Sequence, residues 1–357
     1  MLKQSNINGL KVERLNNGKP ILAARKDHPW ENEVVFNPAC ILLNDGDEIE
    51  RMLDSLAPSH DIYSRIRSMK AVCALVYRAQ GTVTEVEDFR KSRFGFALLS
   101  PELELLYRHD SPIVVPEFAY EDLGVEDPRI TRVDGKFMMC YAGYSSHGAT
   151  EINPVQRNRI NICVASSEDL VHWKKKGPLN GSLNAVNNKN AAFFPSKLDG
   201  KFYMLHRPME GPGAMAVHIA HSNSIDGEWT DEGVLFSAAN DARFTRSWVG
   251  AGAPPLALAD NSLILIYHTG HYKSDGTREY DLGICRITYN GSFKLLSRTD
   301  RFMVPEAESE IIGNETLGVN NVLFACGAYF YGEYIYFPYA GADSRIFGAR
   351  IKTDFVP

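Results

Sequence analysis

The sequence contains no continuous run of about 18 apolar residues, which is the length that a membrane-spanning helix needs. Its first residues, MLKQSNINGLKVERL, lack the apolar core of a secretion signal. No basic cluster occurs, and the formal net charge is −6. We therefore expect a protein without a membrane or nucleic-acid partner.

Cysteine and metal-ligand motifs are also scarce. No two of the six cysteines have metal-ligand spacing, and a chain of 357 residues can bury a core without disulfides. We expect them to be reduced, in a cytoplasmic protein. The histidines are scattered, and neither HExxH nor CxxC occurs, so the sequence predicts no metal site. The glycine-rich segment GAGAPP is not followed by the helix that a nucleotide site requires, so we expect no cofactor. The cysteines are Cys40, Cys73, Cys140, Cys163, Cys285 and Cys326.

What the sequence does contain is a repeat. An acidic or glycine turn leads into a short apolar run and then an aromatic–polar pair. The copies are VDGKFMMCYAG (133–143), LDGKFYMLHRP (198–208), ADNSLILIYHTG (259–270), YGEYIYFPYAG (331–341) and a diverged first copy ending in ALVYRAQ (74–80). They recur roughly every 60 to 70 residues, a length that suits a four-stranded blade with its loops.

Each copy follows a segment of small, apolar and prolyl residues, such as FNPACILL or GVEDPRIT. Such segments are typical of strands buried on both faces, as the innermost strands of a propeller are. The five copies predict an all-β fold, a five-bladed β-propeller that forms a single domain over residues 1–357. The alternative is a β-sandwich with chance periodicity.

Two segments interrupt the repeat. Residues 44–70 carry apolar residues at helical spacing before Pro58, which predicts a helical insertion in the first blade. Its apolar stripe must be covered by the propeller or by a neighbouring subunit, so a homo-oligomer is possible. Residues 145–160 form a polar loop of the length that often carries function.

One local motif stands out for its chemistry, the segment Val125-Glu126-Asp127-Pro128-Arg129. A residue before proline is pushed towards extended backbone, so Asp127 would be held rigidly at the start of an inner strand and point into the central channel. The alternative is an ordinary Asp-Pro turn in which Arg129 makes a surface ion pair.

Polar residues occupy equivalent points in the other repeats. A propeller brings corresponding points of all blades together around its axis, so we expect these side chains to converge on one pocket with Asp127. They are Asn37, Arg78, Lys189, Asn190, Arg207, His268 and Asp343.

These segments, with GAGAPP, YDLG and YAGAD, resemble glycoside hydrolase family 130, which contains β-mannoside phosphorylases and β-mannosidases. The resemblance extends over about residues 33–351. It implies a five-bladed propeller and an inverting reaction on a terminal β-mannosyl unit.

The resemblance also implies roles for individual residues. Asp127 matches the general acid, thought to protonate the leaving oxygen through a hydroxyl of the mannose. The positions that match substrate-binding residues are Asn37, Arg78, Glu126 and Asp343, and those that match the phosphate-binding group are Lys189, Asn190, Arg207, His268 and Tyr280. Arginine and lysine supply the charge-assisted donors that phosphate requires.

One position departs from the family pattern. Trp248 stands where the phosphorylases usually carry a lysine, although Arg243 or Arg246 could reach the same place. No carboxylate occupies a matching phosphate position, and Glu210 is the nearest candidate for the base of a hydrolase.

The leading interpretation is an inverting phosphorylase that cleaves a β-mannoside with inorganic phosphate as co-substrate and releases α-mannose 1-phosphate. The expected partners are thus a manno-oligosaccharide or mannosyl-sugar and phosphate. The alternatives are an inverting β-mannosidase that uses water and a propeller that only binds glycans. A binding module would not need a carboxyl group beside a cationic pocket.

Overall fold

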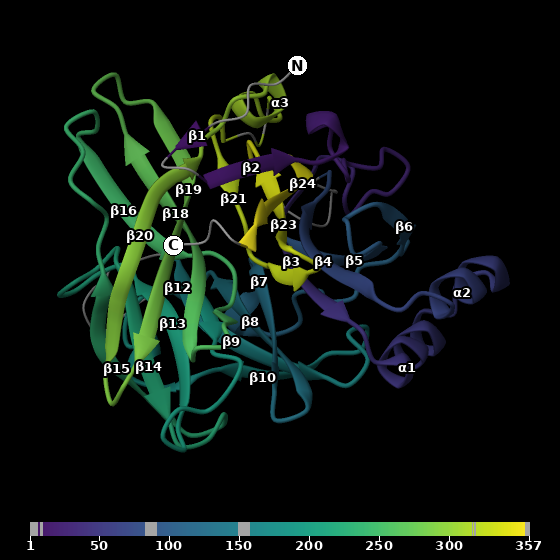
Figure 1. The fold of residues 1–357 in the computed structure, drawn as a ribbon, viewed down its shortest axis with the longest axis horizontal. Coiled ribbons are helices and arrows are strands. Elements are labelled where there is room, and N and C mark those ends of the chain that lie inside the picture. Colours follow the sequence, from purple (N-terminus) through teal and green to yellow (C-terminus); the bar gives the residue numbers. More distant parts are fainter. Residues whose placement is uncertain are drawn as a thin grey trace.

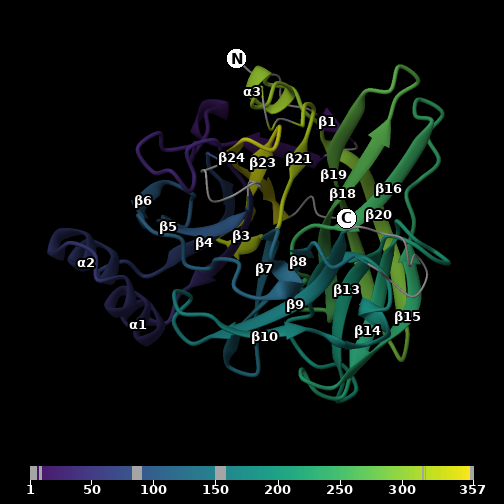
Figure 2. The ribbon, with the colours of Figure 1, turned by 180° about the vertical axis from the view of Figure 1, so that it is seen from behind.

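The computed structural model describes residues 6–7, 10–82, 91–148, 158–315, 317 and 319–353. Figures 1 and 2 show five sheets that follow one another along the chain. The first sheet contains β3 (Val34–Leu43), β4 (Val72–Gln80), β5 (Arg93–Leu99) and β6 (Leu105–Arg108), and the second contains β7 (Gly124–Val133), β8 (Lys136–Ser145), β9 (Arg159–Ser167) and β10 (Lys174–Pro178).

The third sheet contains β12 (Asn188–Phe193), β13 (Phe202–Pro208), β14 (Val217–Ser222) and β15 (Glu228–Phe236), with β11 (Asn180–Gly181) at its outer edge. The fourth contains β16 (Arg246–Ala251), β18 (Ser262–Tyr272), β19 (Arg278–Tyr289) and β20 (Phe293–Met303), with β17 (Leu256–Ala257) beside β18. These are the four-stranded blades that the repeat predicted.

The fifth sheet is assembled from both ends of the chain. Near the C-terminus lie β21 (Leu323–Phe324), β22 (Tyr329–Tyr331), β23 (Tyr334–Gly341) and β24 (Arg345–Lys352), while β1 (Asn6–Ile7) and β2 (Leu10–Arg14) come from the N-terminus. Strand β2 pairs with β24, and Arg14 at its end donates to Glu310 at 2.8 Å on the short helix α3 (Glu308–Ile311). The two ends thereby close the ring, and the predicted five-bladed propeller is confirmed.

The inner strands of the first three blades share a bulge. The register of β3, β7 and β12 shifts between Phe36 and Ala39, between Glu126 and Arg129, and between Lys189 and Ala192. At these bulges Asn37, Asp127 and Asn190 have φ values of 46°, 54° and 57°.

The extended backbone predicted for Asp127 was therefore wrong. The bulge leaves an extra residue unpaired and places it in the left-handed region, which Asn and Asp tolerate better than other non-glycine residues. The same bulge thus sets the direction of an Asn or Asp side chain in each of three successive blades.

The predicted insertion consists of α1 (Gly46–Leu56) and α2 (His60–Arg67), which lie at one edge of the molecule (Figure 1). Asp45 caps α1 by accepting from the backbone N–H groups of Asp47 and Glu48. Neither these helices nor any other in the described residues is long and apolar enough to cross a membrane.

The apolar stripe of α1 is covered by the chain itself. The four residues of this stripe are at most 5% exposed and share a hydrophobic cluster with residues of the first two blades. Ser55 also donates to Asp169 of the second blade at 2.8 Å. The stripe therefore offers no surface to a neighbouring subunit, and the argument for a homo-oligomer loses its basis. The residues are Ile49, Met52, Leu53 and Leu56.

We expect Leu53→Ala to destabilise the protein by about 2–5 kcal/mol, because it leaves a cavity where α1 packs on the propeller. Denaturant unfolding would measure the loss. Glu50→Ala is the matched control on the exposed face of α1, where Glu50 only pairs with Arg67, and should change stability little. An altered oligomeric state of Leu53→Ala without loss of stability would contradict this packing.

Candidate active site

All five blades contribute to a cavity of about 140 Å³. Its lining includes every residue that the sequence placed in the pocket except Glu126 and His268, and it adds three others. The lining residues are Asn37, Arg78, Asp127, Lys189, Asn190, Arg207, Arg278, Tyr280, Val322, Phe324 and Asp343.

Asp127 is 5% exposed and is held by two donors from the first blade. Asn37 Nδ2 donates to its Oδ1 at 2.7 Å, and Arg78 Nη1 donates to the same atom at 3.2 Å. Burial disfavours the charged carboxylate, but the charges of Arg78, Lys189 and Arg129 outweigh it and hold the pKa of Asp127 well below its usual range. Without a bound anion, Asp127 is therefore ionised at neutral pH.

Glu126 lies beside the cavity and orders two of its cations. Its Oε1 accepts from Arg78 Nη2 at 2.6 Å, and its Oε2 accepts from Lys189 Nζ at 2.9 Å. The two bonds fix the Arg78 and Lys189 side chains on either side of one carboxylate, next to Asp127. Glu126 thus positions the groups around the acid.

Arg129 is 1% exposed and spans from the second blade to the fourth. It donates to the carbonyl oxygens of Ala251 at 3.1 Å, Gly252 at 3.1 Å and Asp127 at 2.9 Å. The alternative interpretation of Arg129 as a surface ion-pair partner was wrong, because the bulge turns this side chain inward to backbone carbonyls.

Asp343 enters the cavity from the turn between β23 and β24. Ala342 and Asp343 have φ values of 47° and 46°, and the N–H of Ser344 donates to Gly341 O at 3.1 Å. Two consecutive left-handed residues thus reverse the chain within the three residues that separate the paired Gly341 and Arg345. Burial raises the pKa of Asp343 to about 7, with the Arg78 charge opposing this shift and the Asp127 charge adding to it. The cavity thus contains one carboxyl that is ionised and one that titrates near neutrality.

The expected phosphate side of the cavity is formed by the third and fourth blades. Lys189 and Arg207 are cross-strand partners on β12 and β13. Arg207 is 6% exposed, and its Nε has no hydrogen-bond partner among the described residues, nor does Asn190 Oδ1. Buried donors and acceptors without partners are costly, so these atoms fit a site that binds a polar ligand.

His268 lies behind this lining. It is fully buried, its ring centroid is 4.2 Å from that of Phe324, and both ring nitrogens lack partners among the described residues. Burial and the charges of Arg207 and Arg129 hold its pKa well below the usual range, so His268 is neutral. Gly250 permits this arrangement, since a Cβ there would come within 2.6 Å of His268 Nε2.

Trp248 fills the position of the missing lysine with an aromatic ring. It is 5% exposed and packs edge-on against Tyr280, with 5.4 Å between ring centroids. Neither Arg243 nor Arg246 lines the cavity, and Arg243 is instead paired with Asp241. The expectation that one of them fills the gap was wrong.

Arg278 supplies a cation that the sequence argument missed. It lines the cavity two residues before Tyr280 on β19, so both side chains lie on the same face of the strand. Its guanidinium carbon is 5.7 Å from the Tyr280 ring centroid. The period-2 alternation through Tyr280 was the signal that could have identified it.

Two further predicted features lie elsewhere. Glu210 does not line the cavity, and its Oε1 accepts from the backbone N–H of Asn187 at 3.1 Å. Most of the polar loop at 145–160 is outside the described residues, since 149–157 are not described.

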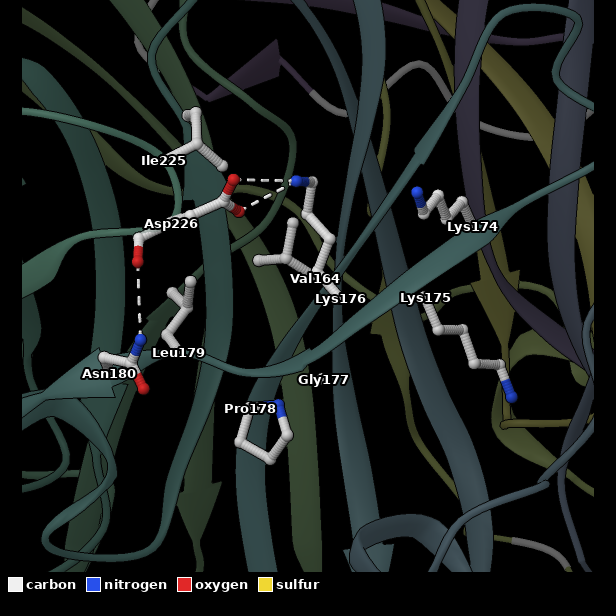
Figure 3. A pocket seen from close by; sticks show the side chains of 10 residues that line it. All are labelled: Val164, Lys174, Lys175, Lys176, Gly177, Pro178, Leu179, Asn180, Ile225 and Asp226. Atoms are coloured by element: carbon white, nitrogen blue, oxygen red, sulfur yellow. Dashed lines mark hydrogen bonds and ion pairs between the residues drawn. The ribbon is translucent and has the colours of Figure 1, made fainter.

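A larger hollow of about 290 Å³ lies where the second and third blades meet (Figure 3). Three consecutive lysines line it, but Lys176 is paired with Asp226 at 2.8 Å and Lys175 with Glu117 at 3.0 Å. Because carboxylates compensate two of these three charges, the hollow is a poorer anion site than the cavity on the axis.

We expect Asp343→Asn to stabilise the protein at pH 8. A carboxyl whose pKa rises from 3.8 to about 7 on folding contributes stability below pH 4 that is lost as the pH rises to 7. Asparagine tolerates the same turn and does not ionise. Thermal unfolding from pH 4 to pH 8 should show the variant gaining on the parent chain as the pH rises. A constant difference would contradict the raised pKa.

Comparison with known proteins identifies the family of this chain. A family model described as beta-1,4-mannooligosaccharide phosphorylase matches residues 71–356. A 1,2-beta-oligomannan phosphorylase from Thermoanaerobacter sp. (strain X514) is 29% identical over 342 residues, covering 94% of this chain and 96% of the relative. A beta-1,2-mannobiose phosphorylase from the same organism is 29% identical over 350 residues, covering 97% of this chain and 99% of the relative.

The fold has close counterparts among solved structures. A glycosyl hydrolase from Bacteroides ovatus superposes with a TM-score of 0.72 at 21% identity, covering 98% of this chain and 96% of that one. The family model spans most of the chain, and the chain folds as a propeller with an axial cavity. The chain therefore belongs to glycoside hydrolase family 130, as the resemblance of its motifs implied.

Proposed function

We propose that this enzyme cleaves the terminal unit of a β-mannoside by phosphorolysis and releases α-mannose 1-phosphate. The observation that carries the proposal is the meeting of one buried, ionised carboxyl, Asp127, with Lys189, Arg207 and Arg278 in a single cavity. Arginine and lysine together favour a multivalent anion, and inorganic phosphate is the co-substrate of this chemistry.

The charges around Asp127 link phosphate binding to protonation. The acid must carry a proton to assist the leaving oxygen, yet the neighbouring cations keep it ionised. A phosphate bound to Lys189 and Arg207 offsets their charge and adds its own, which raises the pKa of Asp127. Phosphate thus favours the protonated acid that the reaction needs.

The reaction is a single displacement. A phosphate oxygen attacks the anomeric carbon on the face opposite the leaving oxygen, and the carbon–phosphate oxygen bond forms as the glycosidic bond breaks. The proton of Asp127 passes to the leaving oxygen. Because the attack comes from the opposite face, the β-linkage becomes an α-phosphate. Asn37 and Arg78 come from the first blade and Asp343 from the fifth, apart from the third and fourth blades that carry the proposed phosphate ligands, and we assign them to the mannosyl ring.

Hydrolysis is less well supported. An inverting hydrolase needs a carboxylate that activates water. Glu210, the candidate from the sequence, lies outside the cavity and accepts a hydrogen bond from the backbone N–H of Asn187. Phosphorolysis needs no second base because phosphate is itself the nucleophile.

We further propose that the substrate is a β-1,2-linked oligomannoside. The two Thermoanaerobacter relatives, which align over nearly the whole chain, are named for that linkage, whereas the family model is described by the β-1,4 linkage. We also propose that residues 1–357 act as one catalytic domain in the cytoplasm, supported by six cysteines that are all free and buried.

Asp127→Asn should lower phosphorolysis of β-1,2-mannobiose by about 10²–10⁴-fold while preserving the fold, because it removes the proton but keeps the shape. Product analysis with and without phosphate, and with β-1,4-mannobiose in parallel, would measure it. Asp226→Asn, in the hollow of Figure 3, is the control and should stay active. A variant at position 127 with more than about half the parent activity would refute the assignment.

Arg207→Ala and Arg278→Met should each raise the KM for phosphate by roughly ten- to a hundredfold, the effect of losing a charge-assisted hydrogen bond, and change the KM for mannoside much less. Initial rates over a phosphate series would separate the two constants. Arg243→Ala, outside the cavity, is the matched control. Undiminished release of free mannose in phosphate-free buffer would instead make the enzyme a hydrolase.

A further inference from the structure

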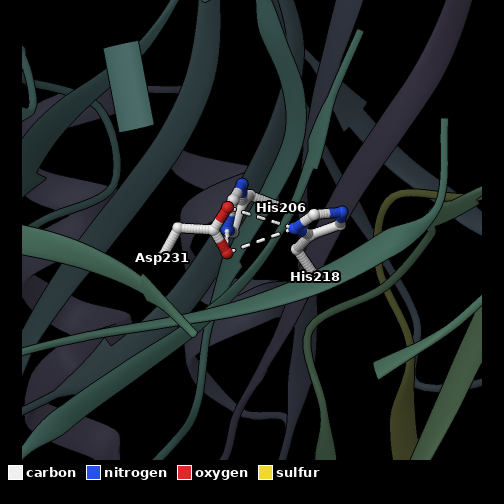
Figure 4. Close-up of side chains that lie close together, drawn as sticks. All are labelled: His206, His218 and Asp231. Carbon is white, nitrogen blue, oxygen red and sulfur yellow. Dashed lines mark hydrogen bonds and ion pairs between the residues drawn. The ribbon is translucent and has the colours of Figure 1, made fainter. Parts of the chain in front are cut away.

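Away from the cavity, two histidines and one aspartate gather on the third blade (Figure 4). His206 lies on β13, His218 on β14 and Asp231 on β15, and the two histidines are cross-strand partners. Their side-chain ligand atoms all lie within 4.8 Å of one another. We propose that these three residues form a binding site for a divalent transition-metal ion of the zinc class. The sequence predicted no metal site, because 206, 218 and 231 match no metal motif.

The separations of the donor atoms fit a metal ion. Asp231 Oδ1 is 3.3 Å from His206 Nε2 and 3.1 Å from His218 Nδ1. Around a tetrahedral zinc ion with bonds of about 2.0–2.2 Å, ligand atoms stand roughly 3.3–3.5 Å apart. The two separations in the blade are equal to or slightly shorter than these values, so a small movement of the side chains would complete the coordination.

Neighbouring groups orient both imidazole rings. His218 Nε2 lies 2.8 Å from the carbonyl oxygen of Gly213 and donates to it, so a metal would bind at Nδ1, the ring nitrogen that faces Asp231. Gly213 is required there, since its φ is 68° and a Cβ would lie 3.1 Å from His218 Nε2. Metal-bound histidines commonly donate their second N–H to a backbone carbonyl in this way.

The second histidine is held by Asn188. His206 Nδ1 lies 3.0 Å from Asn188 Nδ2 and 3.4 Å from its Oδ1. Asn188 Nδ2, which also donates to Leu183 O at 2.8 Å, donates to Nδ1 and so orients the ring with Nε2 towards Asp231. That nitrogen is buried in a residue only 1% exposed, and it has no hydrogen-bond partner among the described residues. Coordination would satisfy it.

The chemistry of the three donors also suits a cation. Asp231 supplies a carboxylate, and each histidine can bind a metal through the ring nitrogen that faces it, once that nitrogen carries no proton. Asp231 is 31% exposed, which leaves room for water as a fourth ligand.

The site would act on the structure of the blade. It joins three adjacent strands, and β13 carries Arg207 directly after His206, on the opposite face of the strand. A bound ion would therefore brace the strand that presents Arg207 to the cavity without entering the cavity. This inference is independent of the proposed reaction.

Calorimetric titration of the chelator-treated full chain with ZnCl₂ in phosphate-free buffer tests the site. We expect one zinc per chain, confirmed by elemental analysis after dialysis, and a thermal unfolding temperature raised by several degrees. Asp231→Asn, which keeps the shape of a partly exposed side chain, and His218→Ala should lose both effects. His221→Ala, also on β14 but outside the cluster, is the control and should retain them.

Cobalt provides a readout that does not depend on stability. Co²⁺ in the parent chain should give the visible absorption of a tetrahedral nitrogen–oxygen site, and Asp231→Asn should abolish it. Absence of zinc binding by the parent chain would show that the trio is only a hydrogen-bonded His–Asp–His cluster and overturn the proposal. Equal binding by the parent chain and Asp231→Asn would place the ion elsewhere and overturn it as well.

Discussion

The axial site depends on the hydrogen bonds of the buried Arg129 guanidinium. A charge in the interior is costly unless it is well hydrogen-bonded, and here three carbonyl oxygens from the second and fourth blades surround it. These bonds fix the bulged segment of Asp127 against the opposite side of the ring. The charge of Arg129 also contributes to the low pKa of Asp127, after the charges of Arg78 and Lys189. Arg129 thus contributes to both the geometry and the electrostatics of the cavity without lining it.

The polar groups of the cavity form one connected system. Glu126 accepts hydrogen bonds from Arg78 and Lys189. Arg78 also donates to Asp127, and Lys189 is the cross-strand neighbour of Arg207. In such a network, a change of charge at one end is felt at the other, because the groups are shielded from water. An acid surrounded by cations is poorly protonated alone and better protonated beside a bound anion. The requirement for phosphate and the strength of the acid are therefore two aspects of the same arrangement.

The fold and most of the cavity lining could be predicted from the sequence, because each blade repeats its pattern and a propeller superposes equivalent positions around the axis. Asn37, Lys189 and Asp343 reach the cavity for that reason. Arg278 was missed because β19 does not belong to the repeated segment. The backbone of Asp127 was mispredicted because a bulge, which depends on pairing with β8, overrides the local preference of a residue before proline. The cluster of His206, His218 and Asp231 depends on the register of three strands, which sequence spacing does not encode.

The pairing of β2 with β24 has a consequence for how the molecule is made. Strand β2 leaves the ribosome before the first four sheets, and its partner β24 leaves after them. Contacts that join such distant segments form late, because the intervening loop must first be closed. During synthesis the first four blades can pack together as an open arc, while β2 has no strand partner until β24 is made. The ring can close only after β23 and β24 have been synthesised, so the axial cavity forms after the strands of all five sheets have left the ribosome.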